Sequence, residues 1–256
     1  FLPFMQDFVI IARGKDAGGD AAGWHMKKRI FLSDIDGTLL NFEVAEESAI
    51  RKGFAAFGLG PCSDAMLAEY STINRTYWQR LERGEITKQA VLEGRFQEFF
   101  SLHGLDPALA VPFNAAYQRN LGDTVCFYPY ALETVQALRS HVLQFAATNG
   151  TKIAQDRKLA RSGLGALLDG ILISEEIGAE KPDPAFFAAA APLLPNCAPD
   201  QILMVGDSLT SDMQLANNVG LAACWYNPKG LQPPAHLHLD YIIQDLRQVP
   251  ALCGLE

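Results

Sequence analysis

Short apolar runs alternate with amphipathic stretches along most of this chain, and this alternation restricts the possible folds more than any other feature. Five runs of four to six residues are bounded by polar residues or glycine, as expected of strands buried on both faces. They are Ile30–Ser33, Val142–Ala147, Ile171–Ser174, Ile202–Val205 and Leu221–Trp225. The intervening helices are expected at Tyr130–Ser140, Lys152–Ser162, Pro184–Leu193 and Ser211–Asn218. The alternation predicts an α/β fold, a parallel sheet with helices on both faces.

Residues 47–127 interrupt this alternation. They hold no convincing strand, and apolar side chains recur there at helical spacing. One such series is Met66, Tyr70, Ile73, Tyr77 and Leu81. We therefore expect a small all-α domain at residues 47–127, inserted into an α/β core that comprises residues 30–46 and 128–256.

The first 29 residues differ from the rest of the chain. An apolar stretch at residues 1–12 is followed by a segment with four glycines and no apolar period. The stretch lacks the basic start and the small-residue cleavage site of a secretory signal. Because Met26 stands just before the first strand signal, we expect the functional domain to start near Met26 and residues 1–29 to form an extension outside the core.

The composition excludes several classes of protein. The chain has 256 residues, of which 49% are hydrophobic, enough for a sizeable core. Its 21 lysines and arginines against 29 aspartates and glutamates give a net charge of −8, which repels nucleic acid and anionic membranes. Five cysteines without a C-x-x-C pair argue against a disulfide framework and a structural zinc site. We expect a soluble cytoplasmic protein, a monomer or homodimer, that binds neither nucleic acid nor membranes.

Polar residues follow the first two predicted strands at the point where each strand ends. Asp34 and Asp36 follow the first strand, and Gly37 permits a tight exit from it. In an extended backbone residues i and i+2 point to the same side, so both carboxylates can face one ligand. Thr148 and Asn149 follow the second strand, where a hydroxyl and backbone donors ahead of a helix suit an anion. Taken alone, each group could equally serve as turn or helix-capping residues.

Two further carboxylates and a lysine complete the pattern. Asp207 and Asp212 lie on the loop after the fourth predicted strand, and Lys181 stands in a segment stiffened by two prolines. Acidic side chains at neighbouring strand ends repel one another unless a cation or a raised pKa relieves the repulsion. Oxygen ligands without a Cys/His cluster select a hard metal, so Mg²⁺ is the expected cofactor. A hydroxyl and a lysine beside such an ion favour a phosphate ligand.

These motifs resemble the four signatures of the haloacid dehalogenase (HAD) superfamily. In chain order they read D-x-D-G-T-L, T-N-G, K-P-D-P and G-D-S-x-x-S-D, with a helical insertion after the first. The resemblance covers roughly residues 30–245. It implies the HAD fold, a Rossmann-like catalytic core, with the insertion as a cap domain.

The resemblance also implies catalytic and metal-binding roles. Asp34 would be the nucleophile that forms an aspartyl-phosphate, and Asp36 would act as general acid and then as general base. Asp34, Asp207 and the backbone carbonyl of Asp36 would bind Mg²⁺, with Asp212 as an auxiliary residue.

The phosphate group would have its own ligands in the same family pattern. Thr148, Asn149 and Lys181 are the residues that the resemblance assigns to binding the phosphoryl oxygens. Asp36 also discriminates between reactions, because a halide leaves without a proton whereas an alkoxide needs one. Its presence favours phosphate chemistry over dehalogenation.

The substrate is expected to be a nucleoside 5′-monophosphate. Gly84-Glu85-Ile86 and the Ile177-Gly178 pair before the K-P-D-P motif are similar to bacterial HAD-type 5′-nucleotidases that act on pyrimidine nucleotides. Cap side chains are expected to choose the substrate, whereas the stripe of Tyr70, Ile73 and Tyr77 is expected to be core. The other candidates to contact the leaving group are Trp78, Phe96, Phe99, Phe100, Tyr117, Arg75, Arg80 and Arg95.

Three alternatives remain open at this point. A phosphatase acting on sugar phosphates or phosphoglycolate would use the same catalytic residues. A phosphomutase would pass the phosphoryl group from Asp34 to a sugar hydroxyl instead of water. A regulatory receiver also places an aspartate at a parallel-strand end with Mg²⁺ and lysine nearby, but it needs neither Asp36 nor a cap.

Overall fold

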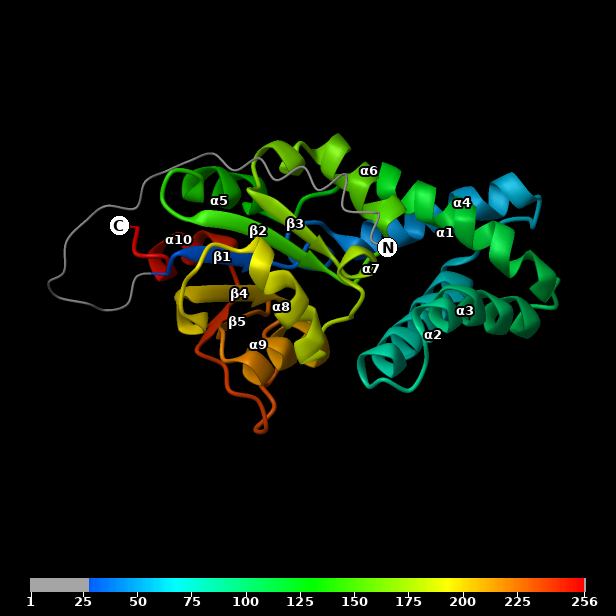
Figure 1. Ribbon diagram of the computed structural model, residues 1–256. Helices are drawn as coiled ribbons and strands as arrows, with labels where there is room; N and C mark the ends of the chain where they lie inside the picture. The colour runs from blue at the N-terminus through cyan, green and yellow to red at the C-terminus, as the bar shows by residue number, and fades with distance from the viewer. Residues whose placement is uncertain (1–27, 256) are drawn as a thin grey trace, which may run out of the picture.

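The computed structural model describes residues 28–255 of the chain. The expected extension at residues 1–29 therefore lies outside the described residues except for Lys28 and Arg29, and so does the expected start near Met26. From Lys28 onward the chain forms an α/β core with a group of helices beside it (Figure 1). No helix in this part of the chain combines the length and apolar character needed to span a membrane.

A six-stranded parallel sheet forms the centre of the core, in the order β3-β2-β1-β4-β5-β6. The strands are β1 (Ile30–Ser33), β2 (Leu143–Thr148), β3 (Gly170–Ile173), β4 (Ile202–Gly206), β5 (Ala222–Tyr226) and β6 (Tyr241–Ile243). The α/β prediction is confirmed, and each of the five predicted strands lies within one residue of its observed bounds. The sequence pattern misses β6 because this strand has three residues, of which only Ile243 is buried.

Helices cover both faces of the sheet (Figure 1). One face carries α5 (Ala131–Leu138), α6 (Lys152–Ser162) and α10 (Val249–Leu252), and the other carries α8 (Pro184–Ala190) and α9 (Gln214–Val219). Neighbouring strand residues serve opposite faces, since Phe31 packs with the first group and Leu32 with the second. Burial on both faces explains why the strands read as continuous apolar runs.

The position of β1 decides where a ligand can bind. It lies between β2 and β4, so the chain winds to one side of β1 before it crosses to the other. In doubly wound sheets this switch point, beyond the carboxyl ends of the strands, is where ligands bind. The short helix α7 (Ser174–Ile177) follows β3 at the same edge of the sheet.

The helix predicted at Ser211–Asn218 starts differently. Leu209–Met213 forms a π-helical turn, and α9 itself begins at Gln214. The hydroxyl of Ser208 caps this turn by accepting the Ser211 N–H at 3.1 Å. The wider turn belongs to the loop that carries Asp212, and π-helical turns often occur at functional sites.

Four helices form the insertion: α1 (Phe42–Phe57), α2 (Asp64–Glu82), α3 (Lys88–Leu102) and α4 (Ala110–Asp123). The expected boundary at residue 47 falls inside α1, which starts at Phe42 because the side chain of Asn41 caps the helix there. Tyr70 and Ile73 are buried among the insertion's own aromatic rings, as expected for core residues. Figure 1 shows these helices beyond the carboxyl ends of the central strands.

Candidate active site

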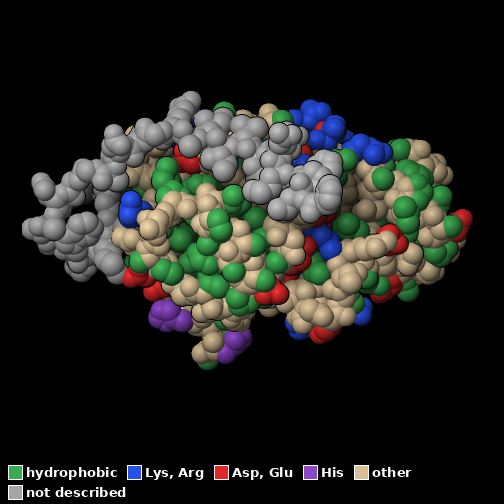
Figure 2. All heavy atoms as spheres, viewed as in Figure 1, with side chains coloured by type: hydrophobic (Ala, Val, Ile, Leu, Met, Phe, Trp, Pro, Cys, Tyr) green, Lys and Arg blue, Asp and Glu red, His purple; other side chains and the backbone are tan. Residues whose placement is uncertain are grey.

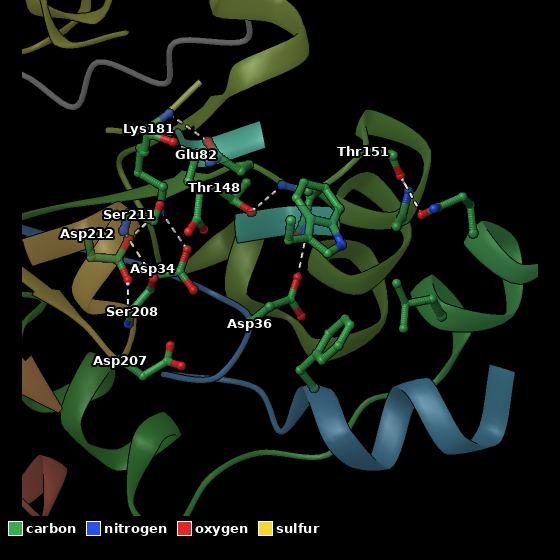
Figure 3. A pocket seen from close by; sticks show the side chains of 18 of the residues that line it. Asp34, Asp36, Glu82, Thr148, Thr151, Lys181, Asp207, Ser208, Ser211 and Asp212 are labelled. Carbon is green, nitrogen blue, oxygen red and sulfur yellow. Dashed lines mark hydrogen bonds and ion pairs between the residues drawn. The ribbon is translucent and has the colours of Figure 1, made fainter. Parts of the chain in front are cut away.

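A cavity of about 180 Å³ lies where the sheet edge faces the insertion (Figure 3). Its walls come from both parts of the chain. The core contributes Asp34, Asp36, Thr148, Asn149, Lys181, Asp207 and Asp212, and the insertion contributes Trp78, Glu82, Arg95, Tyr117 and Gln118. All seven site residues singled out in the sequence are therefore brought together around one cavity.

Asp34 lies at the end of β1 and is held by a buried lysine. The Nζ of Lys181 donates to Asp34 Oδ1 at 2.8 Å and to Asp212 Oδ1 at 2.6 Å. Burial raises the pKa of Asp34, the carboxylates of Asp212 and Asp207 raise it further, and Lys181 opposes this. Burial alone would lower the pKa of Lys181, but Asp212 and Asp34 raise it above its usual value. Lys181 is therefore a fixed positive charge beside Asp34.

Three carboxylates form a cluster at this end of the sheet. Asp34, Asp207 and Asp212 each place one oxygen within 4.8 Å of the others. Burial and the charge of Asp212 raise the pKa of Asp207 to about 7, although the Thr38 hydroxyl donates to it at 3.0 Å. Burial is the largest cause of these raised pKa values, and repulsion between the carboxylates adds to it. Such a set of oxygens suits a hard divalent cation.

Two glycines make room for this cluster. A Cβ atom on Gly37 would lie 2.4 Å from Asp207 Oδ1, and one on Gly206 would lie 2.2 Å from Asp212 Oδ2. Gly37 also has a φ of 98°, which L side chains rarely adopt. The glycine of the first motif is thus needed for the approach of a distant carboxylate as well as for the turn.

The T-N-G segment after β2 places Thr148 and Asn149 differently. Thr148 is buried, and its hydroxyl accepts the N–H of Gly150 at 3.0 Å. The side chain of Asn149 donates to the carbonyl of Lys181 and accepts its N–H, both at 2.8 Å. Asn149 therefore clamps the backbone of the lysine, and its expected contact with a phosphate stays a prediction.

Asp36 does not continue the strand as the sequence argument assumed. The chain bends at Ile35, so the two carboxylates diverge although both line the cavity (Figure 3). Asp36 Oδ2 accepts the side-chain amide of Gln155 at 2.7 Å, and Asp36 Oδ1 contacts the ammonium of Lys158. Neither partner was expected from the sequence, because both lie on an ordinary amphipathic helix, α6.

Glu82 is a further residue that the sequence analysis missed. It is the last residue of α2 and reaches across the cavity, where its Oε2 accepts the Thr210 hydroxyl at 2.5 Å. Burial and the charge of Asp212 raise the pKa of Glu82 to about 7, even though Thr210 and Lys181 oppose this. No sequence signal distinguishes a partly buried glutamate at a helix end, such as Glu82, from a glutamate that is exposed to solvent.

A second contact between insertion and core lies at the start of α3. The Nζ of Lys88 donates to the hydroxyl of Ser174 at 2.8 Å and lies 3.2 Å from Glu180 Oε1. Figure 2 shows acidic and basic side chains gathered where the two parts of the molecule meet. Lys88 and Glu82 thus connect the insertion to the core at two separate places.

The insertion wall carries a buried arginine. Arg95 is 1% exposed and donates to Asn74 at 2.6 Å and to Asn114 at 2.9 Å, while its Nε has no partner among the described residues. Trp78 and Tyr117 line the cavity beside it. Other aromatic candidates lie elsewhere, because Phe96, Phe99 and Phe100 are buried in the core of the insertion. Neither Arg75 nor Arg80 lines the cavity.

Comparison with known proteins places the chain in a family. Residues 28–220 match the family model of haloacid dehalogenase-like hydrolases. The pyrimidine 5′-nucleotidase PynA of Streptococcus pneumoniae is 32% identical over 80% of this chain and 86% of its own length. The crystal structure of the HAD-hydrolase YfnB of Bacillus subtilis, bound to magnesium, aligns with a TM-score of 0.84 and 28% identity, over 90% of this chain and 100% of YfnB.

Dehalogenases share the fold as well. The L-2-haloacid dehalogenase of Xanthobacter autotrophicus aligns with a TM-score of 0.69 over 90% of this chain and 99% of its own. At 18% identity this likeness shows the fold alone. The parallel sheet, the four motifs around one cavity and the match over residues 28–220 lead to one conclusion: the chain belongs to the haloacid dehalogenase-like hydrolases.

Proposed function

We propose that this protein is a Mg²⁺-dependent phosphatase that hydrolyses small phosphate monoesters, with pyrimidine nucleoside 5′-monophosphates as its preferred substrates. The observation that carries the proposal is the arrangement of two carboxylates two residues apart. Asp34 faces a carboxylate cluster and a lysine, whereas Asp36 faces the same cavity from another side. A nucleophile and a separate acid are what the hydrolysis of an alkyl phosphate requires.

The residues present fit a magnesium ion. Asp34 and Asp207 are the proposed side-chain ligands, together with the backbone carbonyl of Asp36 and with Asp212 as an auxiliary carboxylate. The oxygens of Asp34, Asp207 and Asp212 within 4.8 Å of one another support this proposal. Repulsion between these carboxylates adds to the effect of burial on the pKa values of Asp34 and Asp207, and a cation would offset it. When bound, Mg²⁺ would offset the repulsion between a phosphate monoester and a carboxylate nucleophile.

The first half of the reaction belongs to Asp34 and Asp36. A carboxylate oxygen of Asp34 attacks phosphorus, and the bond between phosphorus and the ester oxygen breaks. Asp36 donates its proton to the departing oxygen, which leaves as an alcohol. Lys181 and Thr148 bind the oxygens of the phosphoryl group, and Asn149 supports them by holding the backbone of Lys181.

The second half restores the enzyme. Asp36, now a carboxylate, takes a proton from water, and the water oxygen attacks the phosphorus of the aspartyl-phosphate. The bond between Asp34 and phosphorus breaks, so that inorganic phosphate leaves and Asp34 regains its carboxylate. The acid at position 36 also argues against dehalogenation, in which the halide leaves without a proton.

The division of the chain follows from these roles. Residues 30–46 and 128–256 would form the catalytic core, and residues 47–127 the cap that contacts the leaving group. The relative PynA is a pyrimidine 5′-nucleotidase, and Trp78, which is only partly buried, lines the cavity from the insertion, where its ring suits stacking on a planar base. These two observations support a pyrimidine nucleotide as substrate.

Phosphate release from a panel of esters tests the proposal. With Mg²⁺ present, dUMP, dTMP and UMP should be hydrolysed faster than phosphoglycolate or hexose phosphates. Asp34→Asn should lower turnover to the background rate, and Asp36→Asn should lower it by about 10²- to 10⁴-fold. Asp156→Asn, a change of an exposed carboxylate on α6, is the matched control and should leave turnover unchanged.

Two results would contradict the proposal in different ways. Turnover that persists in Asp34→Asn would remove this residue as the nucleophile. Preference for phosphoglycolate or hexose phosphates would reject the nucleotidase but keep the phosphatase. Conversion of a sugar phosphate into its isomer, assayed in the same panel, would identify a phosphomutase instead.

A further inference from the structure

Two side chains of α6 hold the carboxylate of Asp36 from one side. Gln155 donates its amide to Oδ2 at 2.7 Å, and Lys158 places its ammonium on Oδ1. Lys158 follows Gln155 at the i+3 position, so both project from one face of the helix. The reaction described above assigns no task to either of them.

The burial of this pair points to a function. Lys158 and Gln155 each have no exposed surface, and lysine is almost never fully buried unless it is paired. Removing an ammonium group from water is strongly unfavourable, so its partner must compensate. The carboxylate partner of Lys158 is Asp36, whose side chain keeps 18% of its surface exposed to the cavity.

The T-N-G motif leaves space for the same contact. A Cβ atom on Gly150 would lie 2.0 Å from the amide nitrogen of Gln155, far inside contact distance. Glycine at this position therefore allows Gln155 to reach Asp36. The ring of Phe42, which also lines the cavity, lies 5.8 Å from Lys158 Nζ and covers the lysine on another side.

The two catalytic carboxylates are thus held by different lysines. Lys181 binds Asp34 within the carboxylate cluster, and Lys158 binds Asp36 outside it. Among the described residues, the cluster that could hold a metal contains Asp34, Asp207 and Asp212 but not Asp36. Without Lys158, the side chain of Asp36 would be free to turn toward a bound cation, away from the leaving group.

We propose, on the basis of the function proposed above, that Lys158 and Gln155 are positioning residues that keep the carboxylate of Asp36 on the leaving-group side of the cavity. Neither residue needs to touch the substrate. Their contribution is to the proton transfers of Asp36, so it should show in kcat rather than in KM. Lys158 should hold Asp36 more strongly than Gln155 does, because Lys158 adds the attraction of its positive charge to the hydrogen bond.

Two substrates separate positioning from a structural effect. Hydrolysis of dUMP needs Asp36 in both half-reactions. With 4-nitrophenyl phosphate, Asp34 attacks phosphorus and the weakly basic 4-nitrophenolate leaves the phosphorus without needing a proton, so Asp36 is needed only when water attacks the aspartyl-phosphate. Lys158→Met should lower kcat for dUMP by about 10²-fold with little change in KM. With 4-nitrophenyl phosphate the variant should release about one equivalent of nitrophenol per enzyme rapidly and then turn over slowly, because only hydrolysis of the aspartyl-phosphate is impaired. Gln155→Leu should show the same pattern more weakly.

A double variant and a matched control complete the test. If Lys158 acts through Asp36, then Asp36→Asn combined with Lys158→Met should be no slower than Asp36→Asn alone. The double variant leaves no unpaired buried charge. It should therefore fold even if Lys158→Met fails to fold. Lys152→Met removes an exposed lysine from the same helix and should retain wild-type kinetics.

Three results would overturn the inference. They are losses that multiply in the double variant, a burst that slows as much as steady-state turnover, and a crystal structure of Lys158→Met in which Asp36 keeps its orientation. The crystal structure can be determined whether or not the variant is active. Failure of the wild-type protein to hydrolyse either ester would instead reject the proposed phosphatase, and the orientation of Asp36 would still decide whether Lys158 positions it.

Discussion

Lysine is rarely buried completely, yet the side chains of Lys158 and Lys181 are no more than 1% exposed. Each is paired with a carboxylate just after β1, Lys181 with Asp34 and Lys158 with Asp36. Lys181 could be singled out in the sequence because it stands in the K-P-D-P motif. Lys158 could not, because a lysine in an amphipathic helix normally points to solvent.

Replacing Lys181 tests how much the buried pair contributes to folding. Lys181→Met leaves Asp34 and Asp212 facing one another without a cation between them. Without Mg²⁺ the variant should lose about 3–5 kcal/mol of unfolding free energy, because a buried charge is left uncompensated. Urea denaturation near neutral pH measures this loss. Lys229→Met, which removes an exposed lysine, should change stability by less than about 0.5 kcal/mol, and an equally small loss in Lys181→Met would contradict the prediction.

The elements bring these side chains together through close helix packing. At Gly122 the helix α4 approaches α6 so closely that a Cβ atom would lie 2.8 Å from the carbonyl oxygen of Ala154. One turn earlier on α4, Gln118 accepts the hydroxyl of Thr151 at 2.8 Å, at the start of α6. This contact ties the insertion to the helix that carries Gln155 and Lys158, so α4 supports the position of Asp36 from a distance.

A single methyl group at this crossing should separate the two helices. Gly122→Ala should destabilise the protein by about 1–3 kcal/mol because the added Cβ overpacks the contact. Alanine is the better helix former by up to about 1 kcal/mol, so a stabilised variant would show that α4 can move away freely. Thermal and urea unfolding measure the change. Arg119→Ala, on the exposed face of α4, serves as the control and should be nearly neutral.

At the scale of the whole molecule, the acidic groups of the active site lower the stability of the fold. Three acidic side chains around the cavity, Asp34, Asp207 and Glu82, have pKa values raised by burial. They remain together because the strands of the sheet and the helices of the insertion hold their backbones in place. The folded protein therefore binds protons that the unfolded chain releases near neutral pH, which makes stability depend on pH.

Without metal, stability should fall as pH rises from about 5 to 8. The sign follows from the raised pKa values: in this range the folded state binds more protons than the unfolded state, so deprotonation favours unfolding. Mg²⁺ should restore stability mainly at the upper end, because the carboxylates must be deprotonated to bind it. At about one hundred times its Kd the ion should add about 2.7 kcal/mol.

Urea denaturation with EDTA or Mg²⁺, at about pH 5.5 and about pH 8, measures both effects. Glu82→Gln should flatten the pH dependence in EDTA, because it removes one of the raised groups. A stability that is independent of pH without metal, or a larger effect of Mg²⁺ at the lower pH, would contradict the prediction.

The sequence by itself determined the elements whose signals are local. Apolar periodicity and capping residues act over a few neighbours, so the five longer strands and α6 could be located closely, and the four motifs predicted which polar residues would share an edge of the sheet. Only the tertiary structure decided which side chains from distant parts of the chain contact these polar residues. Lys158 lies 122 residues from Asp36 and Glu82 lies 128 residues from Thr210, and nothing near either residue in the chain marks its partner. Such contacts depend on how helices pack against the sheet, which no short stretch of sequence records.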